Sequence, residues 1–332
     1  MKIVVLGGGC SSERDVSLAT SYSVFNALKK NHSVVFIDSF FGIDSKSINI
    51  DNVFCDEQKI EEFPISKKAP NTRDIKKRKK SMLGENVLEI CRMADFVFIG
   101  LHGSNGEDGK IQALLDMYGI PYNGPGYVAS CISMDKSLTK KLLMLNGVLS
   151  APFIRKPPCV IKCVHGGSSI GTYICKTEKE LKKNLVKAKA YNDDVLIEKF
   201  IEGTEITVPI LGNKALTPIE IVPPKNGRFD YFSKYQNNTL ATEICPARIS
   251  EEETNKIKKL ALRIKKILDL QVYCRIDFII ENISRDIYFL EVNTLPGLTK
   301  NSLFPKSASY EGIGFDELCE TIVKLSVHKK TK

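Results

Sequence analysis

No apolar run in the sequence approaches about 18 residues, no Cys-x-x-Cys pair occurs, and only four of the 332 residues are histidine. A membrane-spanning helix needs about 20 apolar residues, so such a helix is excluded. The apolar run at residues 3–6 ends at glycines and is too short for a signal-peptide core, and we therefore expect a cytoplasmic protein. With 43% hydrophobic and 26% charged residues, the composition is that of a globular chain rather than a disordered one.

The ten cysteines are scattered along the chain, and they favour buried, reduced thiols over a metal site. Cys159, Cys163 and His165 lie close together in the sequence and make a zinc site the alternative. A structural zinc site takes four ligands, usually in paired short spacings, and no fourth ligand is evident near these three.

Lysine and arginine together number 48 against 39 acidic residues, which gives a net charge of +9. Much of the excess lies in a polar stretch at residues 66–80 that contains a proline and no aromatic residue. A solvated loop explains this stretch better than a nucleic-acid surface, where aromatic and basic residues interleave. We therefore predict no nucleic-acid partner and no membrane partner. A basic balance also suits anionic small substrates.

Strands and helices alternate through the first third of the chain. A strand at residues 3–6 runs into Gly7-Gly8-Gly9, and a helix follows from near Glu13. Further strands are predicted at residues 33–37 and 95–101, with an amphipathic helix after the second of them. This alternation is typical of a small doubly wound α/β domain.

The rest of the chain mixes shorter strands with well-capped helices. Thr177 with Glu180 and Ser250 with Glu253 have the spacing of capping boxes, which predicts two helix starts. Residues 223–241 combine proline, glycine, asparagine and aromatic residues without periodicity, which is typical of a lid loop. Short strands are predicted at residues 160–162, 195–197 and 206–211.

The most informative segment is a predicted β-hairpin over residues 272–293. If its turn centres on Ser284, Asp277 lies opposite Glu291 and Arg275 lies opposite Asn293, because each pair is symmetric about that residue. This register gathers four polar side chains on one face of the hairpin. In the second strand, strict alternation predicts one face made of Ile287, Phe289, Glu291 and Asn293.

Two carboxylates that face each other across a hairpin repel, and among apolar neighbours they call for a cation between them. Oxygen donors from Asp277, Glu291 and Asn293, without histidine or cysteine, favour Mg²⁺ or Mn²⁺ over zinc. Mg²⁺ commonly binds substrate phosphates as well, so the hairpin predicts a nucleotide substrate. The alternative is a surface cluster in which Arg275 neutralises one of the acids.

Two glycine-rich loops are candidates for phosphate binding. Residues 165–171, here called the glycine loop, follow a strand that ends at Lys162, so backbone N–H groups and a lysine would meet phosphates there. It is not a Walker loop, because no Gly-Lys-Ser/Thr follows. Gly7-Gly8-Gly9 lacks the third glycine of a dinucleotide fingerprint because Ser12 stands at that position, which disfavours a Rossmann oxidoreductase.

Taken together, the motifs resemble those of the D-alanine–D-alanine ligases of the ATP-grasp superfamily, in the order of that family and over nearly the whole chain. They are GGCSSERDVS at 8–17, LHG and GEDG at 101–109, SMDK at 133–136, GGSSIG at 166–171, IEKF at 197–200, SKY at 233–235, RID at 275–277 and EVNTLPGLT at 291–299.

The resemblance implies an ATP-grasp fold that mixes α/β and α+β structure in three domains. These are a doubly wound, Rossmann-like substrate domain at 1–122, a central ATP-grasp subdomain at 123–198 and a C-terminal subdomain at 199–332 with the metal site and the lid. The chain departs from the family in having only residues 154–159 where a longer stretch with a helix is usual, so the central subdomain is short. The approach to the glycine loop, CVH at 163–165, and the basic stretch at 66–80 also depart from the family pattern.

The resemblance further implies roles for individual residues. Glu13 binds the ammonium group of the first alanine and, with Ser168 and Tyr235, positions the substrate and closes the lid. ATP lies against the phosphate-binding residues Lys136, Lys162 and Lys234 and against the adenine- and ribose-binding residues Glu198, Lys199, Ile201 and Glu205. The second alanine lies against His102, Ser302 and Leu303, the oxyanion is stabilised by Arg275 and the Gly297 N–H, and two Mg²⁺ (or Mn²⁺) ions are held by Asp277, Glu291 and Asn293.

The implied activity is the ATP-dependent ligation of two D-alanine molecules through an acyl phosphate, for peptidoglycan precursor synthesis, by a homodimer. Two alternatives stay open at this point. One is a related ligase that takes D-lactate or D-serine as its second substrate. The other is a degenerate ATP-binding protein without turnover, which the short central subdomain makes conceivable.

Overall fold

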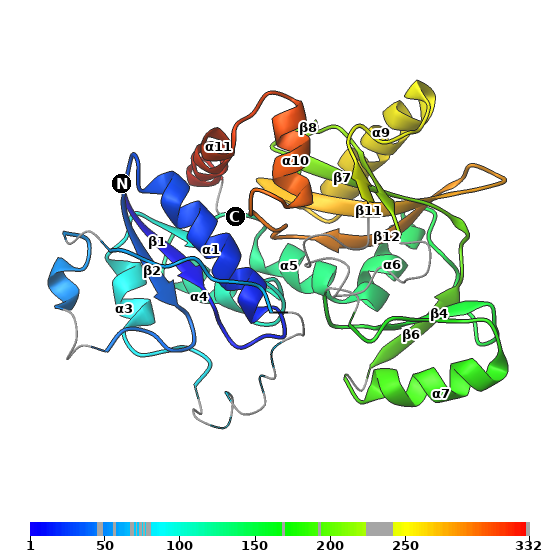
Figure 1. The fold of residues 1–332 in the computed structure, drawn as a ribbon, viewed down its shortest axis with the longest axis horizontal. Coiled ribbons are helices and arrows are strands. Elements are labelled where there is room, and N and C mark those ends of the chain that lie inside the picture. The colour runs from blue at the N-terminus through cyan, green and yellow to red at the C-terminus, as the bar shows by residue number, and fades with distance from the viewer. Residues whose placement is uncertain are drawn as a thin grey trace. The chain divides into compact units, whose positions relative to one another are not determined.

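The computed structural model describes residues 1–44, 49–55, 58–66, 70, 72, 75, 77, 81–167, 170–191, 194–223 and 242–329. The chain divides into two compact units, which are drawn together in Figure 1. Unit 1 comprises Met1–Cys131, Leu270–Cys274 and Thr294–Lys332, and unit 2 comprises Ile132–Asp269 and Arg275–Asn293. Among the helices described, none has the length and apolar character needed to cross a membrane. The three-domain division stays a prediction.

Unit 1 contains a parallel sheet in the order β2–β1–β3. Helix α1 packs on β1 and β2 and also against α11. The elements along this part of the chain are β1 (Lys2–Gly7), α1 (Arg14–Leu28), β2 (Ser33–Asp38), the 3₁₀ helix η1 (Ile50–Asn52), α3 (Val87–Arg92), β3 (Phe96–Ile99), α4 (Lys110–Met117), α5 (Tyr127–Met134, whose last residues belong to unit 2), α10 (Leu303–Tyr310) and α11 (Phe315–Val327).

The strand order of unit 1 determines where a ligand can bind. The central strand β1 is buried from Ile3 onward because its apolar run is covered on both faces, as expected for a parallel sheet. The chain runs from β1 outward to β2 and then crosses back past β1 to β3. Right-handed crossovers in these two opposite directions place α1 and α3 on opposite faces of the sheet. In such sheets ligands bind at the carboxyl ends of the strands where the order reverses. The loops that start at Gly8 and at Gly100 leave β1 and β3 at that edge.

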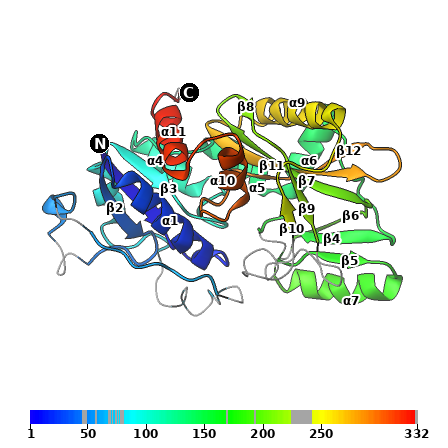
Figure 2. The same cartoon turned by 45° about the horizontal axis from the view of Figure 1, so that its top comes forward.

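Unit 2 contains a small antiparallel sheet in the order β5–β4–β6, covered by α7, as Figure 2 shows. Apolar side chains from β4, β5 and α7 form its core, among them Ile161 and Leu181. The predicted capping box at Thr177 and Glu180 is confirmed at the start of α7. The elements are α6 (Lys136–Leu145), β4 (Cys159–Cys163), β5 (Tyr173–Cys175), α7 (Glu178–Lys189) and β6 (Val195–Lys199).

A larger sheet of unit 2 has the strand order β10–β9–β7–β11–β12, with β8 paired to β7. Helix α9 packs on β7 and β8 through a buried stripe that includes Ile257, Ala261 and Ile264. The predicted capping box at Ser250 and Glu253 is confirmed at its start. The elements are β7 (Gly203–Leu211), β8 (Lys214–Ala215), β9 (Ile219–Val222), β10 (Thr242–Ile244), α9 (Glu251–Ile267), β11 (Tyr273–Glu281) and β12 (Ile287–Asn293).

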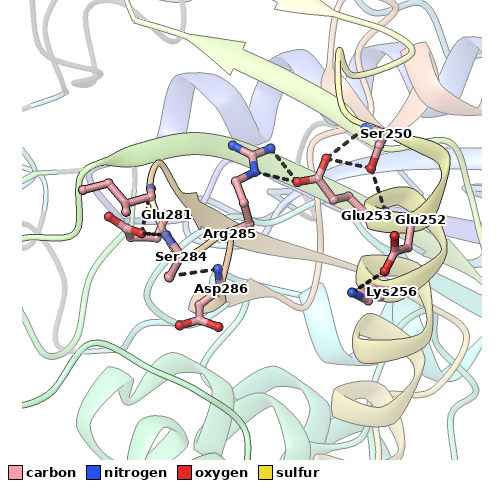
Figure 3. Close-up of polar contacts among 9 residues, drawn as sticks. Ser250, Glu252, Glu253, Lys256, Glu281, Ser284, Arg285 and Asp286 are labelled. Atoms are coloured by element: carbon pink, nitrogen blue, oxygen red, sulfur yellow. Dashed lines mark hydrogen bonds and ion pairs between the residues drawn. The ribbon is translucent and has the colours of Figure 1, made fainter.

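The tip of the β11–β12 hairpin is joined to the first turn of α9 (Figure 3). Arg285 Nε donates to Glu253 Oε1 at 2.7 Å, while Oε2 of the same carboxylate accepts the Ser250 N–H at 2.9 Å. The turn itself is held by the Glu281 side chain, which accepts from the backbone N–H of Ile283 and Ser284. These contacts hold the turn end of the hairpin against α9.

Candidate functional site

The predicted pairing of the polar hairpin residues is confirmed. Asp277 lies opposite Glu291, and Arg275 lies opposite Asn293. The register shifts by one residue between Asp277 and Phe278, because Leu290 is an extra residue in β12.

The bulge at Leu290 makes one sequence prediction wrong. Phe289 pairs with Phe278 rather than sharing the face of Glu291, and both phenylalanines are buried in the core. An extra residue reverses the alternation of faces, so β12 can bury Phe289 and still turn Glu291 toward Asp277. In a strand with strict alternation, Phe289 and Glu291 would lie on the same face, so burial of Phe289 would turn Glu291 away from Asp277.

The Asp277 carboxylate is the centre of the hairpin cluster, and only 3% of the residue is exposed. Arg275 donates to both of its oxygens, from Nε to Oδ1 and from Nη2 to Oδ2, at 3.0 Å each. Thr207 Oγ1 of β7 donates to Oδ1 at 2.5 Å, and Asn293 Nδ2 donates to Oδ2 at 3.0 Å. The guanidinium thus compensates the carboxylate charge that sequence reasoning assigned to a metal ion.

The donor set suits a hard divalent cation. Asp277, Glu291 and Asn293 supply carboxylate and amide oxygens from adjacent positions of two paired strands, and such oxygens are the ligands Mg²⁺ and Mn²⁺ prefer. Within the described residues no group of three or more histidine, cysteine, aspartate and glutamate side chains could hold a metal ion. This set has two such residues and an amide, so it would need substrate oxygens or waters to complete the shell.

Three charged residues form a buried cluster in unit 2. Lys162 of β4 lies 2.7 Å from Glu198 Oε1, and Lys140 of α6 donates to Glu198 Oε2. Burial alone would raise the pKa of the Glu198 carboxyl, but the Lys162 and Lys140 ammonium groups outweigh it, so that its pKa lies below the ordinary value. The carboxyl is therefore ionised at neutral pH.

The glycine loop lies beside the start of α6. The Lys136 N–H donates to the Val164 carbonyl at 3.2 Å, and Lys136 Nζ donates to the Gly166 carbonyl. Lys136 Nζ also lies 3.8 Å from Glu291, which joins this lysine to the hairpin cluster. The fold thus brings Lys136, Lys162, the described part of the glycine loop and Glu291 into one region of unit 2.

The cysteines near the glycine loop are buried, as the sequence predicted. Cys159 and Cys163 face the core of the small sheet, and burial raises the pKa of both thiols. His165 instead lies 3.5 Å from the Asp135 carboxylate and is half exposed. The three residues of the zinc alternative therefore make different contacts: the two cysteines pack in the core, and the histidine lies beside a carboxylate.

Replacing Gly171 by alanine should destabilise the glycine loop. Gly171 has a φ of +74°, and an added Cβ would lie 2.4 Å from Cys163 Sγ. We expect a loss of about 1–3 kcal/mol in unfolding free energy, which thermal unfolding measures.

Gly119→Ala is the matched control, because Gly119 has a φ of +65° but open space around its Cβ position. G119A should lose only the part of the unfolding free energy that comes from the positive φ of the backbone. The double variant G171A/C163A should recover part of the lost stability, since it removes the clashing sulfur. If G171A were no more costly than G119A, close packing at this turn would not matter.

In unit 1, the predicted alanine-binding residues gather at the carboxyl ends of β1 and β3. Glu13 is 5% exposed and stands at the N-cap position of α1, yet its side chain makes no cap hydrogen bond. A Cβ on Gly103 would lie 2.8 Å from Glu13 Oε2, so the carboxylate and the loop after β3 are in close contact. Ser11 Oγ donates to the His102 carbonyl at 2.7 Å, and the His102 ring pairs with Thr20 Oγ1 at 2.9 Å.

Glu107 joins the loop after β3 to the segment that follows β12. Its carboxylate accepts the Gly103 N–H at 2.8 Å and the Leu295 N–H at 3.4 Å, all within unit 1. Gly297 and Ser302 are neighbours, because a Cβ on Gly297 would lie 3.1 Å from Ser302 Oγ. Leu303 is the first residue of α10, and the Ser302 side chain bonds to Thr299 instead of capping that helix.

The remaining predicted residues are in part outside the described residues. Ser168, Lys234 and Tyr235 are among the residues that the structure does not describe, as is most of the predicted lid. Lys199 is the last residue of β6 and is exposed. Ile201 follows β6 in the sequence, before β7 begins, and its side chain is buried. Glu205 lies on β7 and is close enough to Lys162 to raise its pKa.

Sequence reasoning missed three residues that hold the predicted ones in place: Lys140, Thr207 and Glu107. Lys140 had a detectable signal, because it stands four residues after Lys136 and therefore on the same face of α6. Thr207 had none, because nothing in the sequence says that β7 lies next to β11. Glu107 was recognised as part of a motif but without a role.

Comparisons with known proteins cover the whole chain. The family profile described as D-ala D-ala ligase N-terminus matches residues 2–125, and the profile D-ala D-ala ligase C-terminus matches residues 152–324. The chain is 35% identical over 342 residues to the D-alanine–D-alanine ligase of Pediococcus pentosaceus, with 97% of each chain covered. It is 39% identical over 349 residues to that of Halalkalibacterium halodurans, with 99% of this chain and 100% of the relative covered.

Solved structures agree with the sequence relatives. The D-alanine–D-alanine ligase from Bacillus anthracis complexed with ATP matches with a TM-score of 0.74 and 29% identity, covering 98% of this chain and 97% of the other. The enzyme from Coxiella burnetii matches with a TM-score of 0.73 and 27% identity, covering 98% and 94%. The predicted ATP-grasp fold class is confirmed. The two profiles and the full-length relatives together establish that this chain belongs to the D-alanine–D-alanine ligase family.

Proposed function

We propose that this protein is an ADP-forming ligase that joins two D-alanine molecules into D-alanyl-D-alanine at the expense of ATP. The observation that carries the proposal is the hairpin cluster: Asp277 faces Glu291, and Arg275 faces Asn293, in a member of this family. A full-length match to an ATP-complexed relative supports ATP as the co-substrate.

In the first step, a carboxylate oxygen of the first D-alanine attacks the γ-phosphorus of ATP, and ADP leaves. Glu13 binds the ammonium group of this alanine, because it is a buried carboxylate next to the strand edge where ligands bind in such sheets. Lys136 and Lys162 bind the phosphates through charge-assisted hydrogen bonds. Lys234 would extend this contact, and Ser168 would position the substrate with Glu13 and Tyr235. The nucleoside would lie against Glu198, Lys199, Ile201 and Glu205.

In the second step, the amine of the second D-alanine attacks the acyl phosphate and phosphate leaves. Arg275 and the Gly297 N–H are proposed to stabilise the tetrahedral oxyanion, since fixed donors act most strongly where charge develops. His102, Ser302 and Leu303 bind the second alanine. Tyr235 on the lid excludes water, which would otherwise hydrolyse the acyl phosphate.

Asp277, Glu291 and Asn293 would hold the two Mg²⁺ (or Mn²⁺) ions of the proposed enzyme. When bound, such ions neutralise charge on the transferring phosphoryl group. Arg275 must then share Asp277 or release it, since it donates to both carboxylate oxygens here. This competition couples the proposed metal residues to the proposed oxyanion donor.

The further expectations follow from the family. The dipeptide would serve as a precursor of peptidoglycan, the reaction would run in the cytoplasm, where ATP is available, and the enzyme would act as a homodimer. The short segment at 154–159 leaves the ATP affinity to be measured. None of these expectations enters the argument from the site.

The test is the formation of ADP and dipeptide from ATP, Mg²⁺ and D-alanine by the purified protein. We expect both products in equal amounts, and mass spectrometry identifies the dipeptide. D-Lactate and D-serine offered together with D-alanine identify the second substrate, because a mixed product would replace the dipeptide. ADP binding without turnover would contradict the proposal.

A further inference from the structure

Two lysines share one buried carboxylate in unit 2, although one lysine would suffice to neutralise it. Glu198 is 5% exposed, and each of its oxygens accepts from a different lysine: Oε1 from Lys162 at 2.7 Å and Oε2 from Lys140. The three side chains come from three elements, β6, β4 and α6. The second lysine needs an explanation, because a buried ammonium group is costly unless it is paired.

The two lysines differ in their surroundings. The Lys140 side chain is 3% exposed and its ammonium group lies 4.6 Å from the centre of the Phe153 ring, so the carboxylate and an aromatic face surround it. The Lys162 side chain is 15% exposed and is attracted by Glu291 and Glu205 as well as by Glu198. Lys140 thus stands at the closed end of the cluster, and Lys162 at the end that is open to other anions.

Their pKa values are shifted in opposite directions, which agrees with this difference. Burial lowers the pKa of the Lys140 ammonium group despite its contact with Glu198. Burial also opposes the charge of Lys162, but attraction by Glu198, Glu291 and Glu205 outweighs it and raises the pKa. Among the described residues, Glu198 is the carboxylate that attracts Lys140, whereas Lys162 is attracted by three carboxylates.

When Lys162 turns from Glu198 to a phosphate, Glu198 loses one of its two counterions. A lysine that leaves Glu198 would strand a buried carboxylate, unless a second cation stays behind. Lys140 fills this role, because it contacts the other oxygen and stands at the closed end of the cluster.

We propose that Lys140 is a positioning residue for the nucleotide: it is the permanent counterion of Glu198, and it thereby leaves Lys162 available for the phosphates of ATP. This inference rests on the proposed function, in which Lys162 binds ATP. Lys140 itself touches neither ATP nor alanine in this proposal. Its effect should therefore appear in nucleotide affinity rather than in the chemical step.

The variant that tests the proposal is Lys140→Met, which keeps the length of the side chain and removes its charge. We expect the dissociation constant of Mg-ADP, measured by titration calorimetry, and the KM for ATP to rise by about tenfold or more, because Lys162 stays paired with Glu198. The kcat should stay within about threefold of the wild type. A purely structural residue would lower the folded fraction and would not change KM.

Lys141→Met is the matched control, because Lys141 is the next residue of α6 and is exposed. It should leave both constants unchanged. The double variant K140M/E198Q guards against a loss of folding, since it removes the carboxylate together with its counterion. We expect its affinity to be no lower than that of Glu198→Gln alone, because Lys140 acts through Glu198.

Three results would overturn the proposal: an unchanged Mg-ADP affinity in K140M, an equal loss in K141M, or additive losses in K140M/E198Q. Binding of Mg-ADP does not depend on alanine, so this test stands apart from the test of the ligase reaction. If the wild type bound Mg-ADP without forming dipeptide, the proposed function would fail. The comparison of K140M with K141M would still decide the role of Lys140.

Discussion

Asp277→Asn is expected to lower kcat by about 10³-fold or more, the largest effect of any substitution considered for this protein. The substitution removes one of two facing carboxylates and thus one negative charge from the proposed metal site. It also places an amide NH₂ among donors from Arg275, Thr207 and Asn293, where only an acceptor is suitable. Steady-state kinetics over a range of Mg²⁺ concentrations measure the loss and show whether more metal restores activity.

A loss of folding has to be separated from a loss of chemistry in this variant. Leaving buried donors without an acceptor costs about 1–3 kcal/mol, which thermal unfolding detects. Asp286→Asn is the control, because Asp286 lies in the exposed turn of the same hairpin and undergoes the same change of charge (Figure 3). It should have wild-type activity. A D277N enzyme within about tenfold of the wild type would mean that Asp277 holds no metal ion.

Arg275→Met should lower the rate of dipeptide formation by about 10²–10³-fold, the loss typical of one missing oxyanion donor. The variant should also release phosphate in excess over dipeptide, because an acyl phosphate whose aminolysis is slowed has more time to meet water. The ratio of the two products is measured directly. Arg275→Lys should recover only part of the rate, because lysine cannot reproduce the two parallel bonds to Asp277.

Arg285→Met is the control for this prediction, since Arg285 lies on the same hairpin and also pairs with a carboxylate, that of Glu253 (Figure 3). Its side chain is 45% exposed, so the pair should contribute at most about 1 kcal/mol to stability and nothing to activity. If R275M formed dipeptide at the wild-type rate and stoichiometry, Arg275 would serve only to neutralise Asp277.

Much of the local structure could be predicted from the sequence, because it depends on neighbouring residues. Both capping boxes need only a hydroxyl and a glutamate three positions apart, and both are present where the spacing predicted them. The pairing of Asp277 with Glu291 agrees with a register centred on Ser284, but the pairs next to the turn are one residue out of that register, and the bulge restores it. The bulge at Leu290 did not follow, because it depends on whether Phe289 or its neighbour fills the core beneath β12.

The charge partners of the candidate site were beyond prediction for a different reason. Thr207 reaches Asp277 only because β7 is the neighbour of β11 in the sheet, and Lys140 reaches Glu198 only because α6 lies beside β6. The bidentate contact of Arg275 with Asp277 was foreseen only as an alternative to metal binding. The contacts of Thr207 and Lys140 depend on how the strands and helices are arranged in space, which local patterns do not encode.

The sequence by itself determined the family, the starts of the two capped helices and a hairpin with an acid on each strand. Each of these depends on spacing along the chain, and spacing survives in any arrangement of the elements. Only the tertiary structure decided which cations those acids meet and which lysines share a carboxylate. Apart from Arg275, which is two residues from Asp277, these partners are far apart in the chain, as with Lys140 and Glu198, which are separated by 58 residues. The packing of sheets and helices brings them within bonding distance.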